Sequence, residues 1–256
     1  EEDVANMVAN RSLIVSKDDC LSLPDIFQEI RTVRLPKDIM EQYNRLFEFC
    51  IFSLQAKEKQ KKGAYYSAVC KLAVFTKLRE VASGFLIDDY GATVDLHTEK
   101  ITALRQIVEE KPDEQMVIWC QFEHEIKEVE KTLSQYGTVE TAYGKTKNID
   151  ESIHRFKNGE AKYIVAHPKS IKYGVTFTKC CTAIYYSMSY SAEDYYQSRD
   201  RIHRLGQSRI CTYYFIQAEN TIDEVMYEAV EKKMSYAEVF AVIVKQAAKH
   251  GIDYNS

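Results

Sequence analysis

The chain has 256 residues, 45% of them hydrophobic, which is enough for one large α/β domain or two small ones with a buried core. Its longest apolar runs are far shorter than the roughly 20 residues that a membrane-spanning helix needs, so we expect a soluble protein without a membrane partner. The net charge is −4, but residues 141–211 alone are basic, with a net charge of +6. This asymmetry permits a nucleic-acid partner, although a solvated surface of mixed charge gives the same counts.

Seven cysteines without a C-x-x-C pair argue against a zinc site and for reduced thiols in a cytoplasmic or nuclear protein. Because the chain begins at Glu1 without a charged and apolar leader, we interpret it as a piece of a longer protein.

The first 90 residues are predicted to be mostly helical. Apolar residues three or four positions apart predict one helix between Met40 and Leu54, and a second from Val69 to Val81 that stops at Gly84. The stretch 29–35 predicts one short strand. We assign residues 1–95 to a helical lead-in and residues 96–256 to a separate α/β domain.

From residue 98 onward, predicted helices alternate with strands. Thr98, Ser191 and Thr221 are good N-cap residues for three of these helices. Strands are predicted at 115–121, 138–142, 163–166, 182–187 and 210–217, and helices at 101–108, 123–136, 149–157, 192–205 and from 222 onward. Single helices between strands indicate a doubly wound parallel sheet with helices on both faces, whose ligands bind at the carboxyl ends of the strands.

One phosphate-binding motif is incomplete in this sequence. Gly144-Lys145-Thr146 has the ending of a P-loop, but Val139 stands where the motif requires its first glycine. The tight turn that wraps backbone N–H groups around phosphate therefore cannot form. No D-E-x-[HD] stretch that could hold a magnesium ion is present either, so we expect no metal ligands in this chain.

The most informative stretch lies between Gln197 and Gln207. The spacings of four and three among Gln197, Arg201 and Arg204 place them on one face of the helix predicted at 192–205, beside the carboxyl edge of the sheet. Two guanidinium groups one turn apart are suited to a phosphate ligand. The alternative is a surface face of ion pairs with the carboxylates at positions 193, 194 and 200. Spacing alone leaves both open.

The pattern Q-x-x-x-R-x-H-R-x-G-Q, from Gln197 to Gln207, resembles the sixth helicase motif of Swi/Snf-family DNA translocases. The segments 117–122, 144–156 and 167–178 are similar to the family's fourth motif, the element after it and the fifth motif, respectively. In the fifth motif Ile171 and Lys172 replace two of the family's glycines, whereas Gly174 is retained. The sequence is most similar to divergent, phage-type members.

The resemblance implies a RecA-like second ATPase lobe. It implies that Arg201 and Arg204 act as arginine fingers, and that Gln197 and Gly174 help to bind the nucleotide. ATP and Mg²⁺ would be held mainly by a first lobe that this chain lacks. We therefore expect the chain by itself to be inactive as an ATPase.

The resemblance also implies partners and a location. The partners would be a first lobe of the same polypeptide, DNA in duplex form and a protein that the motor remodels. The location would be the cytoplasm of a bacterial or phage-infected cell, or the nucleus of a eukaryote. The expected contacts with DNA phosphates are Gln121, Lys145, Thr146, Lys169 and Ser170.

Two other functions are compatible with parts of this pattern. The second lobe of a DEAD-box RNA helicase has the same strand order and paired arginines, but Gly206-Gln207 argues against it. The other is a non-catalytic module that binds DNA or a protein, in which Arg201 and Arg204 hold phosphate structurally.

Overall fold

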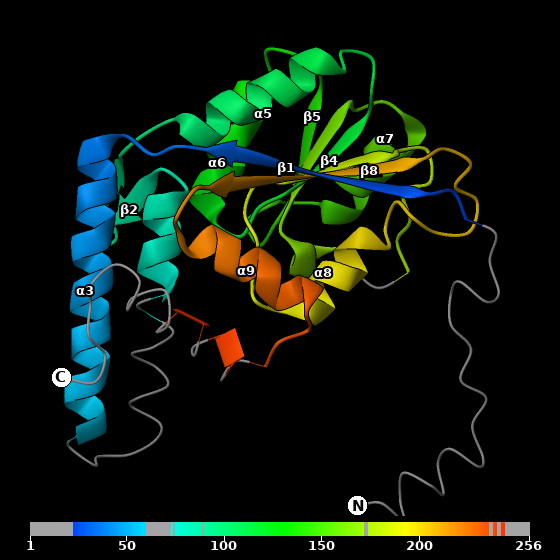
Figure 1. The fold of residues 1–256 in the computed structure, drawn as a ribbon. Helices are drawn as coiled ribbons and strands as arrows, with labels where there is room; N and C mark the ends of the chain where they lie inside the picture. Colours follow the sequence, from blue (N-terminus) through cyan, green and yellow to red (C-terminus); the bar gives the residue numbers. More distant parts are fainter. Residues whose placement is uncertain are drawn as a thin grey trace, which may run out of the picture.

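The computed structural model describes residues 23–59, 73, 75–88, 90–171, 174–235, 238–239 and 242–243. A six-stranded sheet lies at its centre (Figure 1), and all of its neighbouring strands run parallel. The strand order is β1 (Ile26–Val33), β8 (Cys211–Ala218), β7 (Thr182–Tyr185), β4 (Met116–Trp119), β6 (Tyr163–Ala166) and β5 (Val139–Ala142). The predicted doubly wound parallel sheet is confirmed.

Strand β1 belongs to this sheet although it precedes the predicted α/β domain. It pairs with β8 along its whole length, from Ile26 opposite Cys211 to Val33 opposite Ala218. The predicted strand at 29–35 is confirmed, but it begins three residues earlier. The division into residues 1–95 and 96–256 stays a proposal, and β1 pairs across it.

Helices cover both faces of the sheet, because alternate strand residues point to opposite sides. On β4, Met116 and Ile118 pack with α5 (Glu99–Glu110) and α6 (Glu123–Leu133) in one apolar core. Val117 and Trp119 pack in a second core on the other face. That core includes residues of α3 (Lys37–Lys59), the helical segment 75–82, α7 (Ile149–Asn158), α8 (Ala192–Arg199) and α9 (Ile222–Glu231).

The lead-in and its connection to the sheet are described in part. Helix α3 confirms the first predicted helix. The second is described only at residue 73 and from 75 to 82, so its expected start at Val69 lies outside the described residues. A short antiparallel hairpin of β2 (Phe85–Ile87) and β3 (Thr93–Asp95) then leads to α5.

The caps predicted from the sequence form at two of three helices. The Ser191 side chain accepts a hydrogen bond from the Asp194 N–H, and Thr221 accepts one from the Asp223 N–H. Thr98 occupies the N-cap of α5 without such a bond. At the end of α7, Gly159 takes the left-handed conformation with φ of 87°, which stops that helix.

Three predicted helices are too long. Helix α6 ends at Leu133, not at residue 136. Helix α8 ends at Arg199, not at residue 205, and α9 ends at Glu231 before a turn in which Lys233 has φ of 51°. A tertiary contact accompanies the end of α8: the Tyr213 hydroxyl donates to the Arg199 carbonyl at 2.7 Å. The same carbonyl accepts from the N–H groups of Ile202 and His203 only at 3.4 and 3.5 Å.

Four cysteines are described with their side chains, and all are buried and free of disulfides: Cys120, Cys180, Cys181 and Cys211. Burial raises the pKa of the Cys120 and Cys180 thiols. These four cysteines therefore lie in the core, as the sequence predicts. Among the helices that the structure describes, none combines the length and the apolar character required to cross a bilayer.

Candidate functional site

The end of the sixth-motif segment, from His203 to Gln207, lies near the amino ends of strands β1 and β7. The His203 Nε2 donates to the Pro24 carbonyl at 2.8 Å, and the Gln207 Nε2 donates to the Cys180 carbonyl at 2.8 Å. Pro24 and Cys180 each precede the start of a strand by two residues. Arg204, which lies between His203 and Gln207, is therefore not beside the carboxyl edge as expected. Helix α8 carries the chain back across the sheet before Arg201 is reached.

Arg201 is buried and holds the loop of the fifth motif. Its side chain donates to the Val175 carbonyl at 3.0 Å and to the Ile171 carbonyl at 3.2 Å, and only 5% of its surface is exposed. Its own carbonyl accepts from the Phe177 N–H at 2.7 Å. These bonds bracket Gly174, which is exposed and has φ of 85°. Arg201 therefore fixes the sixth-motif segment against the loop that contains Gly174.

Arg204 is different, because its side chain is exposed. Within the part of the chain that the structure describes, no carboxylate forms an ion pair with it. Its backbone is held by Gln207, whose N–H donates to the Arg204 carbonyl at 2.9 Å. Gly206 follows with φ of 96°, a conformation that side chains rarely adopt. An exposed guanidinium thus projects from a fixed backbone.

Gln197 completes the predicted trio but not the predicted face. It is half-buried in α8, and its Nε2 donates to the Glu193 carboxylate at 2.8 Å. Because α8 ends at Arg199, the spacings of four and three no longer place Gln197, Arg201 and Arg204 on one helix face. The expected alignment is wrong.

The Gln207 side chain makes four hydrogen bonds to backbone groups around this segment. Its Nε2 donates to the carbonyls of Cys180 and Ile202, and its Oε1 accepts from the N–H groups of Ser208 and Arg209. Sequence reasoning used Gln207 and His203 only as parts of a motif and gave neither a role. Both side chains are buried in the structure. The sequence did not indicate this burial, because polar residues in a turn are usually exposed.

The five expected DNA contacts lie at the opposite edge of the sheet. They follow the carboxyl ends of β4, β6 and β5, which are adjacent strands. Lys145 and Lys169 are exposed, and their Nζ atoms lie 2.8 Å from Glu123 and 3.5 Å from Asp194. Surface pairs of this kind contribute about 0–1 kcal/mol, so either lysine can exchange its carboxylate for a phosphate at small cost.

The other three expected contacts are constrained more strongly. The Thr146 hydroxyl accepts from the Tyr143 N–H at 3.1 Å and lies 3.2 Å from the Thr141 hydroxyl, so it is used inside its own turn. The Gln121 N–H is held by two side-chain oxygens, and Gln121 is half-buried. Ser170 ends a short 3-10 helix, η1 (Pro168–Ser170), and its N–H donates to the His167 carbonyl at 2.9 Å.

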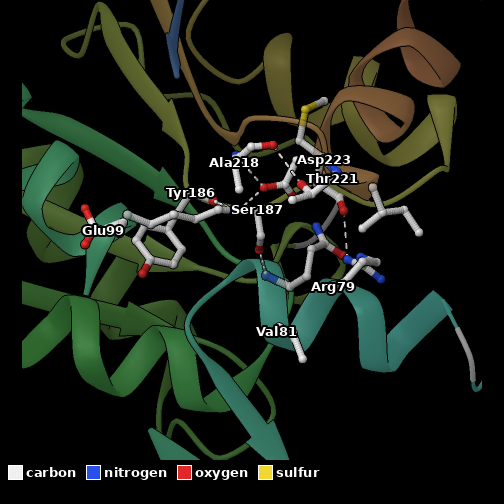
Figure 2. Close-up of polar contacts among 12 residues, drawn as sticks. Arg79, Val81, Glu99, Tyr186, Ser187, Ala218, Thr221 and Asp223 are labelled. Atoms are coloured by element: carbon white, nitrogen blue, oxygen red, sulfur yellow. Dashed lines mark hydrogen bonds and ion pairs between the residues drawn. The ribbon is translucent and has the colours of Figure 1, made fainter. Parts of the chain in front are cut away.

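A cluster of buried charges supports the carboxyl edge. The Lys100 Nζ lies 2.6 Å from the Asp223 carboxylate and donates to the Tyr186 carbonyl at 3.3 Å. The same carboxylate accepts from the Ala218 N–H at 3.0 Å. Figure 2 shows Asp223, Thr221 and Ala218 on one side of this cluster and Arg79 on another. Sequence analysis missed Lys100, although position 100 shares the apolar face of α5 with Leu104 and Ile107.

The described residues contain no group of three or more His, Cys, Asp or Glu side chains arranged to hold a metal ion. At the amino edge, His203 and Gln207 donate to backbone carbonyls within the protein, whereas the guanidinium of Arg204 is exposed. An exposed guanidinium suits an anion.

Residues 99–206 match the family described as helicase conserved C-terminal domain. A segment of 84 residues, 32% of this chain, is 33% identical to the chromatin-remodeling ATPase INO80 of Emericella nidulans and covers 5% of that protein. The curated relatives are much longer than the matched segments, which cover 5–37% of the length of the first two.

Two solved structures share the fold. One is the C-terminal part of the Fun30 ATPase domain, with a TM-score of 0.67, 14% identity, and coverage of 91% of this chain and 100% of that one. The other is the Sulfolobus solfataricus SWI2/SNF2 ATPase core in complex with dsDNA, with a TM-score of 0.62, 18% identity, and coverage of 89% and 49%.

The sheet order and the flanking helices define a RecA-like fold, and residues 99–206 within it are similar to the helicase conserved C-terminal domain. Its fold is similar to those of Swi2/Snf2 ATPase C-terminal domains, in agreement with the resemblance in the sequence.

Proposed function

We propose that this chain is the second motor lobe of an ATP-dependent DNA translocase, which joins a first lobe of the same polypeptide that holds ATP and Mg²⁺. One observation carries the proposal. Arg204 presents an exposed guanidinium on a segment whose backbone is fixed by Gln207, while Arg201 is bound to the loop around Gly174.

In this proposal Arg204 contacts the γ-phosphate when the two lobes close. A guanidinium offers planar, permanently charged donors for the oxygens of a transferring phosphoryl group. Because its backbone is already fixed, Arg204 loses little freedom when it meets that charge. ATP binding would then favour the closed state, and loss of the γ-phosphate would release it. The isolated chain would not hydrolyse ATP.

The sequence suggests that Arg201 is a second arginine finger, but its contacts in the structure favour a positioning role. To act as a finger, its guanidinium would have to leave the carbonyls of Ile171 and Val175. We propose instead that Arg201 positions the loop around Gly174, which would lie beside the nucleotide. Gln197 would contribute a polar side chain next to this loop.

The carboxyl edge would contact DNA. Lys145, Lys169, Ser170, Gln121 and Thr146 follow three adjacent strands there, and the lysines are the most exposed. Phosphate contacts of this kind are independent of base sequence and weaken steeply with salt. A related ATPase core was solved with dsDNA, which supports duplex DNA as the partner. A protein remodelled by the motor, and a bacterial, phage or nuclear setting, remain parts of the proposal.

The test is ATP hydrolysis by the full-length polypeptide, compared without nucleic acid and with duplex DNA, single-stranded DNA or duplex RNA. The proposal predicts strong stimulation by duplex DNA and little by RNA. Stimulation by RNA alone would favour an RNA helicase. Absence of hydrolysis under every condition would favour a binding module, for which the buried position of Arg201 is the supporting observation.

A further inference from the structure

The loops after β4 and β7 are joined at the carboxyl edge by a buried carboxylate. The Glu125 Oε2 accepts from the N–H groups of Gln121 and Phe122, at 2.9 and 3.0 Å, and from the Ser187 hydroxyl at 2.5 Å. Glu125 is 2% exposed. The Ser187 hydroxyl also accepts from the Gln121 N–H, at 2.9 Å. The backbone of Gln121, an expected DNA contact, is therefore fixed by the loop after β7.

Arg79 joins the same two loops from the lead-in. Its guanidinium donates to the Met188 carbonyl at 2.7 Å, and its central carbon lies 4.9 Å from the centre of the Phe122 ring. Figure 2 shows Arg79 extending from the helical segment 75–82 toward the segment that contains Ser187. The Arg79 side chain thus contacts both loops: the Phe122 ring in the loop after β4, and the Met188 carbonyl in the loop after β7.

The loop after β7 is held at three successive residues, each by a charged side chain from a different helix. Lys100 of α5 binds the Tyr186 carbonyl, Glu125 of α6 binds the Ser187 hydroxyl, and Arg79 binds the Met188 carbonyl. Lys100 and Glu125 belong to helices within the α/β domain. Arg79 comes from the segment before residue 96, so its bond makes the loop position depend on the lead-in helix.

We propose that Arg79 is a positioning residue that couples the helical segment 75–82 to the loops after β4 and β7, and so sets the position of Gln121 at the edge that faces DNA. The DNA part of this inference rests on the proposed function. The coupling of the helix to the loops does not, because it follows from the contacts of Arg79 alone.

The experiment measures amide hydrogen exchange in this 256-residue chain with Arg79→Met and Arg79→Lys. Arg79→Met removes the donor to Met188, so we expect exchange at Gln121, Phe122 and Ser187 to rise about tenfold. Arg79→Lys keeps a charged donor and should restore most of the protection. Lys77→Met is the matched control, because Lys77 lies on the same helix but binds Glu80 and the Ile87 carbonyl. It should leave both loops protected.

Unchanged protection in Arg79→Met, or an equal rise in Lys77→Met, would overturn the coupling. Should Arg79→Met fail to fold, Phe122→Leu removes the ring beneath the guanidinium without deleting a hydrogen-bonding group. The same rise in exchange at Ser187 is then expected, and its absence would count against the proposal.

Binding of a labelled duplex DNA to the same variants tests the second half. We expect the Kd of Arg79→Met to rise about threefold to tenfold and that of Arg79→Lys to lie closer to the wild type. If the wild-type chain binds no duplex at low salt, the DNA half and the proposed function both fail, while hydrogen exchange still decides whether Arg79 positions the loops.

Discussion

In the sixth-motif segment, Arg201 is 5% exposed and bound by two backbone carbonyls, whereas at the carboxyl edge Lys145 and Lys169 are exposed and pair with the carboxylates of Glu123 and Asp194. The buried charged side chains of the carboxyl edge, Lys100, Glu125 and Arg79, bind backbone and hydroxyl groups. The exposed lysines there can exchange their carboxylate partners for phosphate. The amino edge instead presents Arg204 on a fixed frame. A fixed guanidinium suits a charge that forms at one position, and exchangeable lysines suit a phosphate backbone of any sequence.

The largest effect on stability should come from Lys100. Its ammonium group is buried against Asp223, so Lys100→Met leaves an unpaired buried carboxylate. We expect the free energy of unfolding of the chain to fall by about 3–5 kcal/mol in urea denaturation. Lys232→Met, which breaks the exposed pair with Glu228, should cost about 0.5 kcal/mol or less. A loss for Lys100→Met as small as that of the control would mean that the cluster does not support the carboxyl edge.

Arg201→Ala should come next. It removes two hydrogen bonds from a charged donor and leaves the carbonyls of Ile171 and Val175 without them. We expect a loss of about 2–3 kcal/mol in urea denaturation of the chain. Arg204→Ala should change stability by less than about 0.5 kcal/mol, since its side chain is exposed. Equal losses of unfolding free energy for the two variants would contradict the proposal that Arg201 positions a loop while Arg204 is free to contact phosphate.

The smallest effect should come from single lysines at the carboxyl edge. Lys169→Ala should weaken binding of duplex DNA only severalfold at moderate salt, and reduce the slope of log affinity against log salt by about 0.9. Fluorescence anisotropy at four or more salt concentrations gives that slope. Lys131→Ala is the control, because Lys131 is exposed near the far end of α6. A change in slope for Lys131 but not Lys169 would place the DNA elsewhere.

The apolar pattern was sufficient to predict the central strands β4, β6 and β7, because each of them is a short, mostly apolar run between turn residues. Strand β6 begins and ends where predicted, at Tyr163 and Ala166. The position of β1 beside β8 could not be predicted, since pairing between Ile26 and Cys211 joins residues that are far apart in the sequence. Local pattern carries no information about such a pairing.

The candidate site was predicted less well than the fold, for a related reason. The motif pointed to Arg201 and Arg204, but the geometry of the segment depends on tertiary bonds: the Tyr213 hydroxyl at the end of α8, and the Arg201 bonds to a distant loop. Placing Gln197, Arg201 and Arg204 on one face assumes that α8 continues past Arg199. The spacing of residues in a sequence does not show where a helix ends. Lys100 could have been expected to be buried from its place beside Leu104, whereas its partner Asp223 could not have been identified.

The most direct test of the division between the two edges is to measure maximal ATP hydrolysis and duplex DNA affinity on the same preparation of full-length Arg204→Ala. We expect the maximal DNA-stimulated rate to fall by about 10³-fold or more, while the Kd for duplex DNA stays within about twofold of the wild type. A rate that survives the substitution, or a rate and an affinity that fall together, would contradict the account.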